Sequence, residues 1–548
     1  MQKYKLYLLS LLSGLLLAAA WPLNGFPFLV FFAFIPLLWV EDIITKDPVK
    51  HGKFSFFFIV FVGFFTWNAL TTYWIWNSTE LGAIFAFLLN SMMMTLGFNF
   101  YHYSRKVIFK KNKAYLALIV YWIAFEYFHT DWDFSFPWLI VGNVFANYPQ
   151  LIQWYEYTGS FGGTLWVFLV NIFLFEIFLH VQNKDSLLVH IKNNFFKTCI
   201  YSGLIIAIPI AFSLIIYHKY NENGKAVEVV VVQPNVDPYS EQYTTPPMEL
   251  LQRMLLLAEE KTDSNVNFVV FPESALQEYV WEEQLYASPS VNTLRGFTQK
   301  YPKLAVIAGI SSQRMLAKNE ALTLAAREFT SEKGRYFEPF NTALMVDHLG
   351  ELKWYHKSKL TPGVEKMPFK KFFKPIEKFA INLGGTVGSL GVDEERKVFD
   401  SKNGVKVSPI ICYESIYGGF VTGFVRNGAE LLFIITNDGW WGNTAGHRQH
   451  FSYAALRAIE CRRDIARSAN TGVSCFINQR GDVLQSTTYW KPAVIRQTLY
   501  ASNQITFYVK YGDYIGKIAL YSGILLLLLS FIKGVKINNQ NKWCKKQK

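Results

Sequence analysis

SPIICYESIYGG, residues 408–419, contains the end of an apolar run, and the last residue of that run is Cys412. The run itself, VKVSPIIC at 405–412, is rich in β-branched residues and has the length of a buried strand. Tyr413 and Glu414 would then turn the chain, which places Cys412 at the carboxyl end of that strand. Functional side chains of α/β domains often lie at such strand ends. We therefore predict an α/β domain with a candidate nucleophile at Cys412, against the alternative of a small buried apolar residue.

Runs of the same kind recur on both sides of this strand. They alternate with polar helical patterns, as strands and helices do in an α/β domain. The predicted strands lie at 227–233, 267–271, 303–310, 341–347, 405–412, 430–436 and 473–479. Helical patterns lie at 247–262 and 446–465, and the stretch 454–472 is interpreted as helical. We predict one α/β domain over residues 226–510.

Two further motifs add charged side chains to the cysteine. VVFPESAL, 269–276, is an apolar run that ends at Glu273. YHKSKLTPGVEKMPF, 355–369, carries Lys357 and Glu365. A neutral thiol is a poor nucleophile, so a base must take its proton, and Glu273 is the candidate. Because a carboxylate alone disfavours a thiolate, the ammonium of Lys357 would stabilise both the thiolate and the oxyanion formed on a carbonyl.

The motifs FPES, YHKSKLTP and ICYES resemble, in this order, the Glu-Lys-Cys triad of the nitrilase superfamily of carbon-nitrogen hydrolases and their acyl-transfer relatives. The resemblance implies a nitrilase-like α-β-β-α sandwich. It also implies that Glu273 acts as base and acid, that Lys357 stabilises the oxyanion and that Cys412 carries the acyl group. The segment after Lys357 reads LTPGVE where the family often has Pro-Phe-Gly-Glu, which leaves its turn geometry open.

The same resemblance gives supporting roles to residues near these motifs. Glu365 would assist as a second carboxylate, or else be a surface or ion-pairing residue. Tyr413 and Glu414 follow the nucleophile as in the membrane-bound branch of the family. The Tyr413 N–H is a candidate second oxyanion donor, and both residues are alternatively positional. Trp440 and Trp441, within TNDGWWG, would line an acyl-chain slot or pack in the core.

Neighbouring polar residues are interpreted as structural. Asn437 and Asp438 would cap the turn of the Asn-Asp-Gly sequence. Cys461 would be buried, and Arg462 and Arg463 would form ion pairs. The chain has five cysteines without a CxxC pair, and no histidine cluster has metal-ligand spacing, so we expect no metal and no cofactor.

The composition places part of the chain in a membrane. Of its 548 residues 51% are hydrophobic and 17% charged, whereas soluble domains carry about 25% charged residues. Apolar segments that approach spanning length lie near 6–20, 26–40, 54–76, 82–104, 114–128, 160–181, 198–217 and 514–532. We predict an eight-helix transmembrane bundle, from residues 1–225 and 511–548, with the α/β domain inserted between the seventh and eighth helices. A cleavable signal peptide is the alternative for the first segment.

The basic residues predict the orientation of this bundle. Lys and Arg cluster at both termini and on alternate loops, whereas the loops near 21–25, 77–81 and 129–159 contain none. By the positive-inside rule both termini are then cytoplasmic and the α/β domain lies on the opposite side. Since orientation explains so much of the net charge of +13, no nucleic-acid partner is expected.

The loop 129–159 is apolar and aromatic but is broken by Pro137, Gly142 and Pro149. These breaks disfavour a spanning helix and favour an interfacial or re-entrant segment. Its tryptophans, Trp132, Trp138 and Trp154, would then suit the level of the lipid headgroups.

The whole architecture resembles the apolipoprotein N-acyltransferase branch of the superfamily, which implies a multi-pass protein of the bacterial inner membrane with a periplasmic catalytic domain. The resemblance further implies that Cys412 takes an acyl chain from a phospholipid as a thioester. The acyl group would pass to the α-amine of the diacylglyceryl-cysteine of an apolipoprotein. We expect a monomer, in which residues 366–381 are either an arm that touches headgroups or an exposed basic loop.

Two other functions fit parts of the sequence. A membrane-tethered nitrilase-type amidase acting on a small amide would use the same three residues. A transporter or receptor with a sensing domain would instead place charged residues along a path inside the bundle. Glu126 and Glu176 are the acidic residues within the predicted spans, and they form no evident relay.

Overall fold

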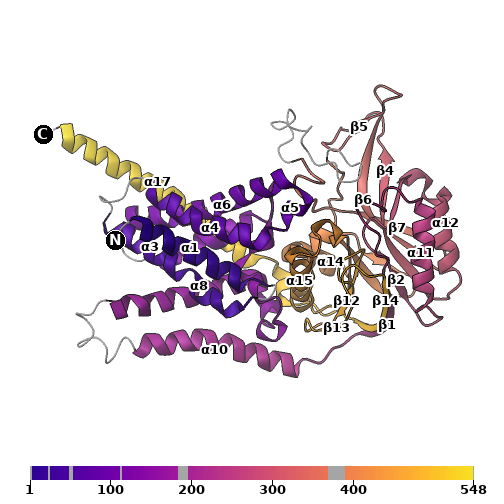
Figure 1. Cartoon of the computed structure of the whole chain (residues 1–548), viewed down its shortest axis with the longest axis horizontal. Helices are drawn as coiled ribbons and strands as arrows, with labels where there is room; N and C mark the ends of the chain where they lie inside the picture. The colour runs from indigo at the N-terminus through magenta and orange to yellow at the C-terminus, as the bar shows by residue number, and fades with distance from the viewer. Residues whose placement is uncertain are drawn as a thin grey trace. The chain divides into compact units, whose positions relative to one another are not determined.

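The computed structural model describes residues 3–22, 25–47, 54–110, 114–182, 196–367 and 389–546. The chain forms two compact units (Figure 1). The first consists of Met1–Trp76, Glu80–Ile216 and Asp513–Lys548, and the second of Asn77–Thr79 and Tyr217–Gly512. The predicted domain boundaries at 225/226 and 510/511 stay predictions.

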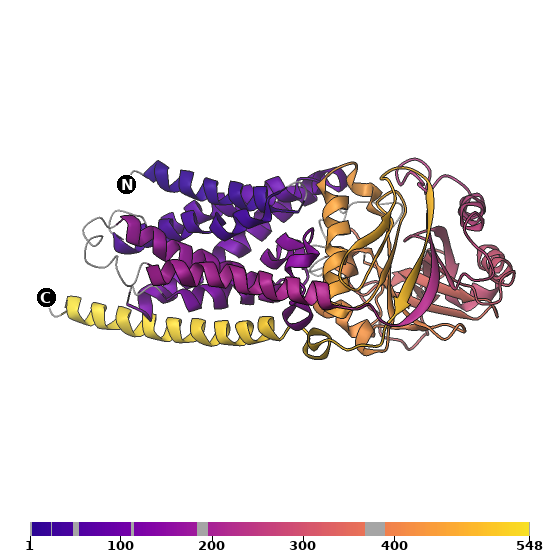
Figure 2. The ribbon, with the colours of Figure 1, turned by 90° about the horizontal axis from the view of Figure 1, so that it is seen from below.

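The first unit is a bundle of apolar helices that run alongside one another (Figure 2). They are α1 (Lys3–Ala20), α2 (Val30–Ala33), α3 (Ile35–Lys46), α4 (Ser55–Thr72), α5 (Ile75–Ser78), α6 (Glu80–Val107), α7 (Tyr115–Phe128), α8 (Tyr155–Gln182), α10 (Phe196–Lys219) and α17 (Tyr514–Lys546). Among the described residues seven segments are long and apolar enough to cross a membrane, and α7 is a shorter apolar helix. Each predicted span falls on one of these helices, so the chain is membrane-embedded. Eight crossings and their orientation stay predictions.

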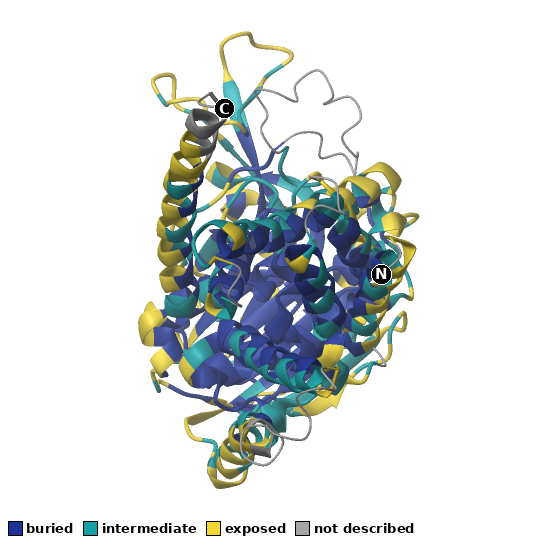
Figure 3. Cartoon of the chain, turned by 90° about the vertical axis from the view of Figure 1, so that its left-hand side faces the viewer, coloured by how far each residue is buried: buried dark blue, intermediate teal, exposed yellow. Residues whose placement is uncertain are grey.

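Helix α17 brings the far end of the chain back to this bundle. Its Ser530 Oγ lies 2.8 Å from the Ser104 Oγ of α6. Large apolar residues such as Tyr521 and Leu525 are exposed on this helix, and Figure 3 shows exposed residues along its length. A helix that is apolar all round, with its outer face unpaired by protein, is typical of contact with lipid.

The segment between α7 and α8 contains short 3-10 helices at Pro137–Leu139, Val141–Phe145 and Pro149–Leu151, in place of a spanning helix. The Glu126 carboxylate anchors it, because this group accepts the Val141 N–H at 2.8 Å and the Thr164 hydroxyl at 2.7 Å. Trp138 and Trp154 are buried in protein, and the position of the segment at the level of the lipid headgroups stays a prediction.

Charged residues at one end of α3 and α6 are paired with each other. Arg105 binds Glu41, and its second nitrogen lies 3.0 Å from Asp42. His102 lies 2.7 Å from Glu41, and all four side chains are buried. Helix α3 is longer than the predicted span, which is why Glu41 and Asp42 were not expected within it. Pairing inside a bundle stabilises helix contacts and does not resemble a charged transport path.

The second unit contains two packed sheets with helices outside them (Figure 1). One sheet has the order β14-β1-β2-β4-β6-β5, with β3 on β4 and β7 on β6. The other has the order β13-β12-β11-β10-β9-β8. Across the sandwich the Phe268 and Phe433 rings lie 5.1 Å apart. This is the α-β-β-α sandwich that the sequence predicts.

The strands and helices of this unit have the following bounds: β1 (Lys225–Gln233), α11 (Pro247–Glu259), β2 (Phe268–Val270), β3 (Leu276–Trp281), α12 (Pro289–Thr298), β4 (Ala305–Met315), β5 (Arg327–Glu328), β6 (Tyr336–Asp347), β7 (Leu352–His356), β8 (Phe399–Asp400), β9 (Lys406–Ile411), α14 (Gly418–Arg426), β10 (Leu431–Thr436), α15 (Ala445–Cys461), β11 (Ile465–Ala469), β12 (Cys475–Ile477), β13 (Val483–Ser486), β14 (Ala493–Ala501) and α16 (Phe507–Tyr511). All seven predicted strands are confirmed. The buried strand β10 is apolar almost throughout, because both faces of its sheet are covered.

The prediction of helix over 454–472 is wrong beyond Cys461. Arg462 adopts a left-handed conformation, with φ of 48°, and ends α15. The chain then forms β11 in parallel register with β10, where Ile434 pairs with Arg467. A central strand position thus overrides the helical pattern of the sequence.

Strand direction brings separate segments to one edge of the sandwich. Strands β9 and β10 are parallel in one sheet. In the other, β2 is parallel to β4, while β6 is antiparallel to both β4 and β7. The carboxyl ends of β2 and β7 therefore share an edge, and the residues that follow them are the predicted Glu273 and Lys357.

Candidate active site

Cys412 lies directly after β9 in a strained turn. Its φ is 47°, a left-handed value that costs a residue with a Cβ about 1–3 kcal/mol. The side chain is buried, with 8% exposed. The short 3-10 helix Cys412–Ile416 follows, in which the Ser415 hydroxyl donates to the Cys412 carbonyl at 2.7 Å. Strain of this kind persists only where the surroundings hold it, and here it fixes the direction of the thiol.

Lys357 follows β7 and is held by the backbone on either side of it. The N–H groups of His356, Lys357 and Ser358 donate to three separate acceptors: Asp393 Oδ2 at 2.9 Å, Asn341 O at 2.8 Å and Glu414 Oε1 at 2.6 Å. The Nζ atom then lies 3.0 Å from Glu273 Oε1 and 2.9 Å from Glu365 Oε1. The lysine therefore links two carboxylates from different segments.

Glu273 lies three residues beyond the end of β2, in a turn where Ser274 has a φ of 55°. Gly309 of β4 permits this turn, because a Cβ there would lie 2.6 Å from the Glu273 Cα and 2.5 Å from the Ser274 nitrogen. The second carboxylate oxygen, Oε2, accepts the Asn437 N–H at 3.0 Å. Segments after β2 and β10 are thus joined at this carboxylate.

The structure brings Glu365 to the same place, as expected from the sequence. Its Oε2 accepts the Thr361 N–H at 2.9 Å, and Lys357 Nζ lies 2.9 Å from each of its two oxygens. Asn341 lies between the two carboxylates: its Nδ2 atom is 2.8 Å from Glu273 Oε1 and 2.9 Å from Glu365 Oε1. Asn341 was missed in the sequence, since an asparagine inside a strand carries no signal of its own.

Glu414 connects the nucleophile turn to the lysine segment. Its Oε1 accepts the Tyr355 hydroxyl and the Ser358 N–H, both at 2.6 Å, and its Oε2 accepts the Ile411 N–H at 2.8 Å. Burial raises the pKa of its carboxyl to about 7. These hydrogen bonds favour the charged carboxylate and so make the rise smaller. Tyr413 is buried, and its ring lies 5.4 Å from that of Tyr417.

Trp440 and Trp441 lie in a 3-10 helix, Asp438–Trp441, and are partly exposed. The Trp440 ring lies 5.2 Å from Tyr239 and 6.5 Å from Tyr243. The Trp441 ring is edge-on to His450 at 5.6 Å. These aromatic residues therefore border the site segments without being fully buried core. Of the expected headgroup arm, 366–381, residues 368–381 lie outside the described residues.

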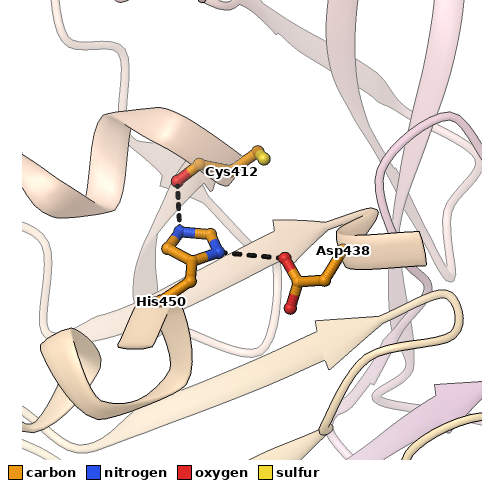
Figure 4. Close-up of side chains that lie close together, drawn as sticks. All are labelled: Cys412, Asp438 and His450. Carbon is orange, nitrogen blue, oxygen red and sulfur yellow. Dashed lines mark hydrogen bonds and ion pairs between the residues drawn. The ribbon is translucent and has the colours of Figure 1, made fainter. Parts of the chain in front are cut away.

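A buried network beneath Cys412 was not expected from the sequence (Figure 4). His450 of α15 lies 3.2 Å from the Cys412 carbonyl oxygen and 2.9 Å from Asp438 Oδ1. Arg467 of β11 donates to Asp438 Oδ2 at 2.6 Å. Asn437 caps its turn as predicted, but Asp438 serves this network instead. The sequence contains no clear signal for it, because Arg467 stands in the polar stretch RRDIARSAN, 462–470, where its burial is not evident.

Cys412, Asp438 and His450 are also a group whose ligand atoms lie within 4.8 Å of one another, although no metal site was expected. In Figure 4 the sulfur points away from the imidazole, and the backbone carbonyl faces it. Arg467 lies 2.6 Å from Asp438 and 3.1 Å from His450 Nδ1, so a cation already balances the carboxylate. The donor set fits a hydrogen-bond network better than a metal ion.

The electrostatics of the site favour a neutral thiol at rest. Burial and the Glu273 carboxylate raise the pKa of Cys412 well above its usual range, against the lowering effect of Lys357. Burial lowers the pKa of Lys357, but Glu273 and Glu365 outweigh it and raise that pKa. Burial likewise opposes ionisation of Glu365, yet Lys357 and the Thr361 N–H hold its pKa below the usual value. The ammonium of Lys357 can therefore stabilise the Cys412 thiolate once the thiol has lost its proton.

Comparison with known proteins covers both units. Residues 13–173 match the model of the apolipoprotein N-acyltransferase N-terminal domain, and residues 229–503 match the carbon-nitrogen hydrolase model. An apolipoprotein N-acyltransferase of Chlorobaculum tepidum is 27% identical over 96% of this chain and 97% of its own. Those of Geobacter metallireducens and Thermotoga maritima are 25% and 26% identical, each over 96% of this chain and over 95% and 94% of their own.

Proposed function

Because the chain belongs to the carbon-nitrogen hydrolase family, as a member with the N-terminal domain of apolipoprotein N-acyltransferases, we propose that it N-acylates lipoproteins. The acyl donor is a phospholipid and the acceptor is the α-amine of an N-terminal diacylglyceryl-cysteine. The observation that carries this proposal is the site itself, in which Cys412, Lys357 and Glu273 meet in a membrane-embedded chain. The three relatives named above, which match this chain over nearly their whole length, carry the acyltransferase name.

In the first half-reaction Glu273 takes the Sγ proton of Cys412, and the thiolate attacks the ester carbonyl of the phospholipid. Lys357, whose charge lowers the pKa of Cys412, stabilises the thiolate and then the oxyanion, with the Tyr413 N–H as second donor. The C–O bond breaks, the lysophospholipid oxygen takes the proton from Glu273, and a thioester remains on Cys412.

In the second half-reaction the acceptor amine attacks this thioester. Glu273 takes a proton from the nitrogen and returns it to the sulfur as the C–S bond breaks, so that an amide and the free thiol result. Glu365 keeps Lys357 in place, and Trp440 and Trp441 border the acyl chain. A dry site would suppress attack by water on the thioester.

The location follows from the charge distribution and the family. We propose a monomer in the bacterial inner membrane, with both termini cytoplasmic and the catalytic unit in the periplasm. The alternative, a membrane-tethered amidase acting on a small amide, would use the same three residues and would have no need for lipid substrates.

The test is intact-mass analysis of the purified chain after mixing with phospholipid, with Cys412→Ala alongside. We expect an added acyl mass on wild type that hydroxylamine removes and that the variant lacks. An acceptor lipopeptide should then discharge the acyl mass and gain it as an amide. Release of ammonia from a small amide, with no acyl mass on the chain, would favour the amidase.

A further inference from the structure

Asn341 is held in the site by its amide nitrogen. The Nδ2 atom donates to Glu273 Oε1 and Glu365 Oε1, at 2.8 and 2.9 Å. Two carboxylates offer acceptors and no donors, so the nitrogen end of the amide must face them. The orientation of this side chain is thereby fixed by its partners.

The oxygen end of the same amide has no hydrogen-bond partner among the described residues, although it is buried. An asparagine kept for stability would be expected to use both ends, because an unpaired buried carbonyl costs free energy. The contact of Asn341 with Lys357 runs through the Asn341 backbone carbonyl and does not require the side chain. The amide is therefore directed at the two carboxylates alone.

The charges around it explain what the amide does. Lys357 Nζ and Asn341 Nδ2 meet the same two oxygens, so two carboxylates share a single ammonium. Two carboxylates this close raise the pKa of one of them. A neutral amide that donates to both lowers this repulsion without adding charge. The other titratable groups that face the pair are Cys412 and Tyr243.

We propose that Asn341 is a positioning residue that keeps Glu273 ionised and aligned to receive the Cys412 proton. This inference rests on the proposed function, because it assigns to Glu273 the role of base. Without the amide, the two carboxylates would share only the Lys357 ammonium, and the pair would take up a proton more readily than in wild type. A protonated Glu273 has no free position for the thiol proton, so the thiolate would not form.

The experiment measures the rate of thioester formation against pH for wild type and Asn341→Ala. We expect a loss of about 10- to 100-fold at pH 7 and an acidic limb moved upward by about one pH unit. Asn341→Ser keeps one donor and should lie between the two. Asn341→Asp adds a third carboxylate and should be the least active.

Asn478→Ala is a matched control in the same unit. Its Nδ2 atom also donates to two carboxylates, Glu222 at 2.6 Å and Asp482 at 3.1 Å, which are not part of the site. This variant should keep the wild-type pH profile. A loss in Asn341→Ala that is equal at every pH, or no loss, would overturn the inference.

A second readout separates this inference from the proposed function. Infrared titration of the carboxyl band in the unacylated chain follows protonation of Glu273 and Glu365 without any acyl donor, with Glu273→Gln and Glu365→Gln to assign the bands. We expect the band of a protonated carboxyl to appear at higher pH in Asn341→Ala than in wild type. If wild type forms no thioester, the proposed function fails, while the titration still decides the role of Asn341: an unchanged band overturns it.

Discussion

The Glu414 carboxylate accepts the N–H of Ser358 at 2.6 Å, and this bond joins the turn that begins at Cys412 to the segment that carries Lys357. The same carboxylate holds the Ile411 N–H, immediately before Cys412. Its buried position makes the link sensitive to pH, because burial raises the pKa of Glu414 to about 7.

Stability should fall as pH rises from about 4.5 to about 7, because folded Glu414 keeps a proton that the unfolded chain loses. The full shift corresponds to about 3 kcal/mol. Glu414→Gln removes this dependence, and melting temperatures in detergent from pH 4 to 8 measure it. Asp464, whose pKa burial also raises to about 7, contributes to both proteins, so the difference between the two curves isolates Glu414. Parallel curves would contradict the prediction.

Lys357→Met should lower the rate of thioester formation by about 10²–10³-fold, since one oxyanion donor contributes about 2.7–4 kcal/mol. The carboxylates of Glu273 and Glu365 also lose their shared cation. Single-turnover acylation measures the loss. Lys353→Met, four residues earlier at the start of β7, removes an ammonium that binds the Asp400 carbonyl and should leave the rate unchanged. Equal losses in both variants would contradict the role of Lys357.

Cys412 should react slowly with iodoacetamide at pH 7 and faster as pH rises, because burial and Glu273 hold its pKa well above the usual range. Glu273→Gln should speed alkylation and Lys357→Met should slow it, since these groups shift the thiol pKa in opposite directions. Peptide mass mapping measures the labelling. Cys461 and Cys475, whose pKa burial raises to about 12, should stay unlabelled in the folded chain. Rapid labelling of Cys412 at pH 7 would show that the thiol is not neutral at rest.

Gly309→Ala should reduce both stability and acylation, because the added Cβ would lie 2.6 Å from the Glu273 Cα. The turn that carries Glu273 would have to move. Gly296→Ala is the matched control: no atom lies within 4 Å of its added Cβ, and the residue is inside α12. That change should raise stability by about 0.5–1 kcal/mol and leave acylation intact. Melting temperature and acylation rate test both, and a fully active Gly309→Ala would exclude the close approach as a requirement.

The sequence by itself determined the apolar helices, the strands with apolar runs and the segments that carry Glu273, Lys357, Glu365 and Cys412. Each of these rests on local patterns: hydrophobic length, alternation with helices, and short motifs at strand ends. Strand β11 was not predicted because its pattern is helical, and its position beside β10 depends on a partner strand.

Only the tertiary structure decided how the motifs meet. Asn341, His450 and Arg467 act through partners from 12 to 68 positions away in the chain, so no short sequence motif contains both members of a bond. The same holds for the strained φ of Cys412 and for the close approach that Gly309 permits. The sequence specifies each side chain. The direction of a hydrogen bond and the burial of a charge depend instead on which strands lie side by side.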